Sequence, residues 1–128
     1  MKNDPASTLS QVISSMVLQY AGGIHVGFPC RVISFNESTC RADLQPLIKS
    51  SDTNPAMIQN VPALGHRYKI NGSESVCTPF LKVGDTVFVV CADNEIKNAL
   101  TGSVASADTS RTHDVNDAVI VGVLPCSL

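Results

Sequence analysis

The chain has 128 residues, of which 44% are hydrophobic and 16% are charged, and its net charge is −2. This length fits a single domain that buries a core of its own and needs neither a disulfide nor a metal ion for stability. The nine basic residues are scattered, which disfavours a nucleic-acid-binding surface, and the charged fraction lies below the usual ~25%, which favours a surface partly covered by other subunits.

The cysteines and histidines form no recognisable disulfide or metal-binding pattern. No CxxC, HxH or HExxH motif occurs, and the number of cysteines is odd, which disfavours both a disulfide framework and a zinc site. The sequence therefore predicts no metal ion and no cofactor. The cysteines, each interpreted as structural, are Cys30, Cys40, Cys77, Cys91 and Cys126.

Residues 5–21 are predicted to form an amphipathic helix. Asp4 can cap its start, Pro5 suits the first turn, and Gly22-Gly23 ends it. The apolar residues at helical spacing would either pack on their own domain or contact another subunit, and the sequence leaves both open. We take them as the candidate subunit interface: Leu9, Val12, Ile13, Met16, Val17 and Tyr20.

From residue 26 onward the apolar residues recur at every second position, which is typical of strands. A first hairpin is predicted around the turn at 36–39, and its register places Cys30 opposite Gln45, too far from Cys40 for a disulfide. A weaker edge strand is predicted over 57–64. The dipeptide Asn71-Gly72 predicts a second, tight hairpin.

The strongest strand signal is the segment 86–92, which is apolar on both faces and is predicted to be a central strand. A short helix over 95–101, a loop over 103–117 and a last strand over 118–124 follow. This order predicts a mostly β fold: a small OB-type β-barrel of five to six strands, with an N-terminal amphipathic helix and one short helix between late strands. Residues 1–24 would form an N-terminal helical extension and residues 25–128 the barrel domain.

Two alternative functions are weighed from the residues. A small hydrolase could use His113 as a base oriented by Asp114 or Asp117, but no nucleophile motif accompanies it, so we predict no catalytic residue and no enzyme. A single-stranded nucleic-acid-binding module would need stacked aromatic side chains over a basic groove. Phe28 and Phe88 are expected in the core, which leaves too few aromatics for such a surface.

Three segments in the order LQPLIK (44–49), VGDTVFVVCAD (83–93) and RTHDVNDAV (111–119) resemble a known family. They are similar to the N-terminal OB domain of the membrane-puncturing spike proteins of contractile phage tails, which are relatives of the V-type baseplate assembly proteins. The resemblance covers about residues 25–124. It implies a homotrimer on the tail axis, in which the OB domains join the spike to the central hub of the baseplate.

Proteins of that family usually continue into a C-terminal β-helix with a tip, whereas this chain ends directly after the last predicted strand. We therefore expect a trimeric hub plug that carries a separately encoded tip protein, with residues 125–128 and the N-terminal helix as contacts. The expected location is the virion, after synthesis in the host cytoplasm, because no signal peptide is apparent. Neither nucleic acid nor stable membrane insertion by this chain alone is expected.

Overall fold

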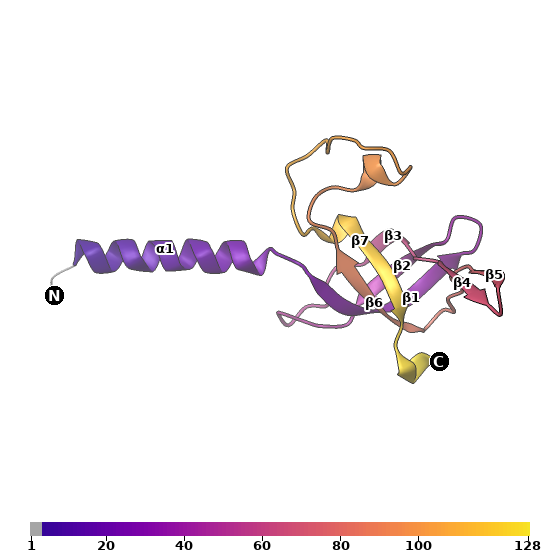
Figure 1. The fold of residues 1–128 in the computed structure, drawn as a ribbon. Helices are drawn as coiled ribbons and strands as arrows, with labels where there is room; N and C mark the ends of the chain where they lie inside the picture. The colour runs from indigo at the N-terminus through magenta and orange to yellow at the C-terminus, as the bar shows by residue number, and fades with distance from the viewer. Residues whose placement is uncertain (1–3) are drawn as a thin grey trace.

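The computed structural model describes residues 4–128 and shows a mostly β fold, as predicted (Figure 1). The helix and strands follow in the order α1 (Pro5–Gly22), β1 (Gly27–Asn36), β2 (Arg41–Pro46), β3 (Ile58–Pro62), β4 (His66–Ile70), β5 (Ser73–Cys77), β6 (Thr86–Cys91) and β7 (Ala118–Val123). Single 3-10 turns follow the later strands at η1 (Lys97–Ala99), η2 (Val115–Asp117) and η3 (Pro125–Ser127).

Five of the strands form one curled, half-barrel sheet in the order β3-β2-β1-β6-β7, with every neighbouring pair antiparallel. The sheet curls far enough for its two edges to meet. At the meeting point Ala63 forms a parallel bridge with Ile120, and the backbone N–H of Leu64 donates to the Ile120 carbonyl at 3.1 Å. Strands β4 and β5 pair only with each other and form the hairpin predicted at Asn71-Gly72. The expected five to six barrel strands are therefore five.

The core fills the inside of the curled sheet, and it follows the two-residue period of the sequence. On β1, for example, Cys30 and Val32 are buried while Arg31 and Ile33 are exposed. On β6 the sequence indicated burial on both faces, but only Val87, Val89 and Cys91 are buried, and Phe88 and Val90 point outward. Small and β-branched side chains dominate because the interior of a five-stranded sheet is narrow. The buried apolar residues are Cys30, Val32, Ala42, Leu44, Ile58, Val61, Leu81, Val87, Val89, Cys91, Ala118 and Ile120.

Three details of the fold differ from expectation. A bulge between Val32 and Ser34 shifts the first hairpin by one residue, so Cys30 pairs with Pro46 and not with Gln45. The helix predicted over 95–101 is reduced to the single turn η1, because the segment before it is held by hydrogen bonds to the loop that follows. Phe88 is 36% exposed and lies outside the core, so that prediction was wrong.

The five cysteines are all free, but they differ in environment. Burial raises the pKa of the Cys30 thiol to about 12 and that of Cys91 to about 11, so both remain protonated and behave as small apolar side chains. Cys77 and Cys126 are exposed.

A thiol reagent added to the native protein is therefore expected to modify Cys77 and Cys126 quickly and to reach Cys30 and Cys91 only after unfolding. Peptide mapping by mass spectrometry after timed labelling measures each site separately. Equal rates at Cys30 and Cys77 in the native state would contradict the burial that the fold assigns to Cys30.

Candidate functional site

Helix α1 begins and ends where the sequence predicts. The Asp4 side chain accepts a hydrogen bond from the backbone N–H of Ala6 at 3.1 Å, and Pro5 occupies the first helical position. Gly23 caps the other end, where its N–H donates to the Tyr20 carbonyl at 3.1 Å. The segment Pro5–Gly22 contains no charged residue.

None of the side chains of α1 is buried, and the helix points away from the sheet (Figure 1). The six residues of the candidate subunit interface are 49–69% exposed. Packing on the domain's own core, one of the two options that the sequence left open, is therefore not what the structure shows. The other option, contact with a second chain, stays a prediction.

The exposed apolar residues of α1 have the spacing of a helix-packing seam. Ala6, Leu9, Ile13, Met16 and Tyr20 recur at alternating steps of three and four residues, as the inner positions of a coiled coil do. Two further apolar residues widen this seam at positions that often carry charges in two-stranded coiled coils, namely Val12 and Val17. The resulting face is broader than a two-stranded seam needs.

A groove of about 880 Å³ opens at the root of α1, between the start of β1 and the segment that joins β2 to β3. Apolar side chains such as Val26, Phe28, Ile48 and Met57 line it, and no Asp, Glu, Lys or Arg occurs among the described residues on its walls. His25 is the titratable group there. The groove continues the uncharged surface of the helix onto the domain.

The loop between β6 and β7 is organised by a charge cluster that the sequence analysis missed. Arg111 binds Asp117 through two hydrogen bonds, from Nε to Oδ2 at 2.7 Å and from Nη2 to Oδ1 at 2.9 Å. Arg111 also pairs with Glu95, at 3.3 Å between Nη1 and Oε2. Asp117 and Glu95 are only 1% and 7% exposed. Arg111 and Asp117 follow Glu95 by 16 and 22 residues, a separation too long and too irregular to give a periodic signal in the sequence.

Both carboxylates of this cluster are held in their ionised form. Hydrogen bonds from Arg111 lower the pKa of Asp117, and the backbone N–H of Asp108 and the hydroxyl of Thr109 lower the pKa of Glu95. Because every acceptor oxygen has a donor, the cluster fixes the shape of the loop and leaves no carboxylate free for acid–base chemistry.

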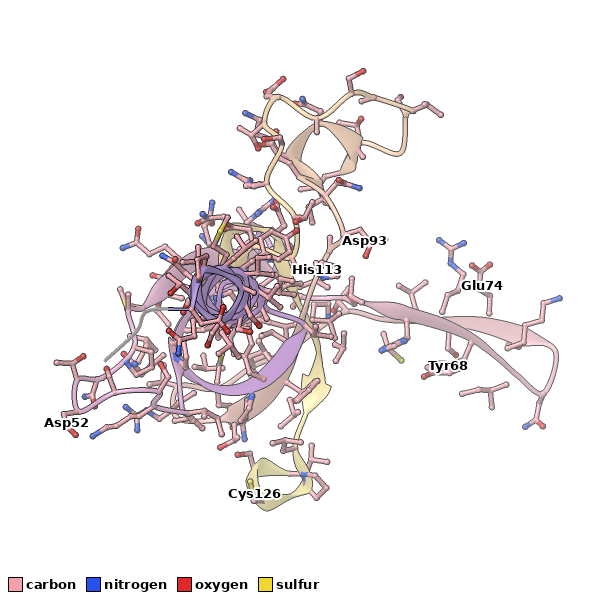
Figure 2. The ribbon with its side chains drawn as sticks, turned by 90° about the vertical axis from the view of Figure 1, so that its left-hand side faces the viewer. Asp52, Tyr68, Glu74, Asp93, His113 and Cys126 are labelled. Atoms are coloured by element: carbon pink, nitrogen blue, oxygen red, sulfur yellow. The ribbon has the colours of Figure 1, made fainter. Side chains whose placement is uncertain are left out.

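His113 lies in the same loop, with a backbone φ of 46° in the left-handed region. Its Nε2 is 3.5 Å from Oδ1 of Asp93, and the two side chains lie together in Figure 2. Asp114 caps η2 and Asp117 binds Arg111, so neither orients His113 as the hydrolase alternative required. Within residues 4–128 no hydroxyl or thiol is hydrogen-bonded to this imidazole.

The remaining ligand classes find little support in the part of the chain that the structure describes. Across residues 4–128 no three His, Cys, Asp or Glu side chains gather where they could hold a metal ion. Over the same residues, no helix has both the length and the apolar character that a membrane crossing requires. The exposed aromatics outside α1, namely Tyr68, Phe80 and Phe88, come from three separate segments, and among the described residues no ring contact joins them.

The fold and its helix define a small, mostly β domain whose most distinctive surface is apolar and exposed, which is typical of proteins that bind other proteins. The comparison with known families is specific. The family described as phage protein Gp138 N-terminal domain matches residues 28–122, which is most of the chain, and the chain belongs to this family. A search of curated proteins found no match. Membership in a phage protein family indicates a structural role and a place in the virion.

Proposed function

We propose that the protein is an axial component of a contractile phage tail baseplate. It is a non-enzymatic homotrimer of OB-type barrels that plugs the central hub and links it to a separately encoded spike tip. The observation that carries this proposal is α1, whose uncharged apolar stripe has no partner among residues 4–128. Membership in a phage protein family supports the setting in a virion.

The strand order supports the OB type for the barrel. The first strand, β1, lies between β2 and β6, and the sheet closes where Ala63, directly after β3, forms a parallel bridge with Ile120 of β7. A five-stranded, partly open barrel of this kind is the architecture of the OB fold. The hairpin β4–β5 occupies the connection between β3 and β6.

The exposed stripe of α1 supports self-association. Isolated helices of about this length are marginally stable in water, and helices in proteins gain most of their stability by packing an apolar face. Completing the burial of the six interface side chains is worth on the order of 6 kcal/mol for each copy, since a fully buried side chain of this size contributes ~1.5–3 kcal/mol. Three copies packed through α1 would place the helices on the tail axis.

The C-terminal turn, which lies below the barrel and away from α1 in Figure 1, offers a surface for a second partner. The turn η3 is tied to the barrel where the backbone N–H of Thr86 donates to Oγ of Ser127 at 2.7 Å, and Leu128 is 90% exposed beyond it. Residues 125–128 are therefore available for contact with the tip protein, while the groove at the root of α1 is available to the hub.

Light scattering on the purified protein over a range of concentrations tests the proposal. A stable species with about three times the mass of the 13.5 kDa chain is expected. A chain that stays monomeric at all concentrations would contradict self-association through α1. Addition of single-stranded DNA to the same samples is expected to leave the mass unchanged.

A further inference from the structure

A second unpartnered surface lies on the outside of the sheet, over β6 and β7. We call it the outer wall and define it by Phe88, Val90, Val119 and Val121. Val90 pairs with Val119, so the two share a face, and Phe88, Val90 and Val121 are 36–38% exposed. A Cβ placed on Gly27 would lie 2.9 Å from the Phe88 ring, so this ring extends the wall over β1.

The composition of the outer wall indicates that something covers it. Antiparallel sheets with one face in water usually carry polar residues on that face, whereas strands buried on both sides are apolar throughout. The strand sequences TVFVVC (β6) and AVIVGV (β7) are apolar at nearly every position, which is typical of strands buried on both faces. The outer face of these two strands is nevertheless exposed to solvent among residues 4–128. Contact with another chain would bury this apolar outer face and account for its composition.

The hairpin β4–β5 has one charged face and one uncharged face. The charged face carries Arg67, Lys69 and Glu74, and Nε of Arg67 lies 3.1 Å from Oε1 of Glu74. Figure 2 shows Glu74 and Tyr68 on opposite sides of the hairpin. We call the other side the uncharged face, and it consists of His66, Tyr68, Ile70, Ser73, Ser75 and Cys77.

Among the residues that the structure describes, no other element packs on this hairpin. Every residue of β4 and β5 is exposed except Ser75, which is half-buried. A two-stranded hairpin without a packing partner is marginally stable in water. It lies at the end of the domain away from α1 in Figure 1, and in the view along α1 in Figure 2 it extends sideways from the domain.

We propose that the uncharged face of the hairpin packs on the outer wall of a neighbouring copy of the same chain. The direction of the contact rests on the proposed function, because helices on a common axis would make each hairpin reach sideways toward the next subunit. Both surfaces lack charge and combine aromatic with aliphatic side chains, whereas the charged face of the hairpin stays in water. The contact joins two different surfaces, and three copies close it into a ring.

Disulfide trapping tests this contact with a thiol that the chain already has. Cys77 already lies on the uncharged face, and Val121→Cys places a second thiol on the outer wall. The substitutions Cys40→Ser and Cys126→Ser remove the other accessible thiols. Mild oxidation of the trimer is expected to give disulfide-linked dimers and trimers on a non-reducing gel. The matched control puts the second thiol in the exposed turn after β1, as Glu37→Cys, and is expected to give none.

A charge series gives an independent readout. Val90→Lys or Tyr68→Glu is expected to raise the concentration at which half of the trimer dissociates by at least about tenfold. The double variant is expected to recover most of that loss, because the two new charges attract each other. Lys69→Glu on the charged face is the control and is expected to change the midpoint less than threefold.

The outcomes separate this contact from the proposed function. A trimer by mass that gives no more cross-linking with Val121→Cys than with Glu37→Cys would overturn the hairpin contact and leave the trimer intact. A chain that is monomeric at every concentration would contradict both. Cross-linking specific to Val121→Cys, together with recovery in the double charge variant, would establish the contact.

Discussion

Replacing Ile13 by lysine is expected to reduce the mass of the protein in solution from that of a trimer to that of a monomer. Ile13 lies at the middle of the α1 seam, between Leu9 and Met16, and is 53% exposed in the single chain. In a helix bundle its side chain would be enclosed by the other copies. An ammonium group there would lose its hydration without an acidic partner, because α1 carries no charged residue.

Leu18→Lys provides the matched control in the same helix. Leu18 is 73% exposed and lies on the side of α1 opposite the seam, so a lysine there stays in water. Light scattering is expected to find this variant trimeric and Ile13→Lys monomeric, with a loss of helical circular dichroism in Ile13→Lys alone because the unpacked helix frays. If Ile13→Lys remained a trimer, as Leu18→Lys is expected to, the subunit contacts would lie elsewhere than on the α1 stripe.

The sequence predicted those parts of the fold that depend on local patterns. The bounds of α1 followed from Asp4, Pro5 and the glycine pair at 22–23, and the tight hairpin followed from Asn71-Gly72. Phe28, Cys30 and Val32 face the core from β1, as the expected period of two predicts. Each of these signals acts over a few residues, where backbone geometry and side-chain chemistry determine the outcome.

The features that sequence reasoning missed depend on contacts between distant residues. The bulge at Val32 and Ser34 changes the register of a hairpin without any turn signal to announce it. The pairing of Arg111 with Glu95 arises only when the loop folds back on itself, and the same fold prevents the predicted helix over 95–101. Phe88 fitted an apolar strand pattern, but periodicity alone cannot show whether a neighbouring chain covers a face.

The sequence placed the six candidate interface residues on one face of a helix, and their contact with another chain stays a prediction. These six residues form one exposed stripe, as the helical period predicts, and the structure adds that no other part of residues 4–128 covers this stripe. The outer wall and the uncharged face of the hairpin needed the strand pairing as well, because their residues come from separate segments.

Asp117→Asn is expected to lower the free energy of unfolding by about 2 kcal/mol at pH 7. The substitution keeps the size of the side chain but removes the charge that Arg111 binds through two hydrogen bonds. Breaking a buried ion pair typically costs ~3–5 kcal/mol, and the cost is smaller here because Arg111 is partly exposed and keeps its contact with Glu95. Urea unfolding followed by circular dichroism measures the difference.

The effect of this substitution is expected to depend on pH in one direction. Because the pKa of Asp117 is lower in the folded chain than in the unfolded chain, the stabilisation is complete above the unfolded value near 4 and is lost as the pH falls through the folded value. The difference between the native protein and Asp117→Asn should therefore shrink between pH 5 and pH 3. Asp93→Asn, at a side chain that is 87% exposed in the same loop, is the control and should change stability by less than about 0.5 kcal/mol. A difference for Asp117→Asn that is the same at pH 7 and pH 3 would show that its carboxylate charge does not hold the loop, and that the shape of the segment between β6 and β7 depends on packing alone.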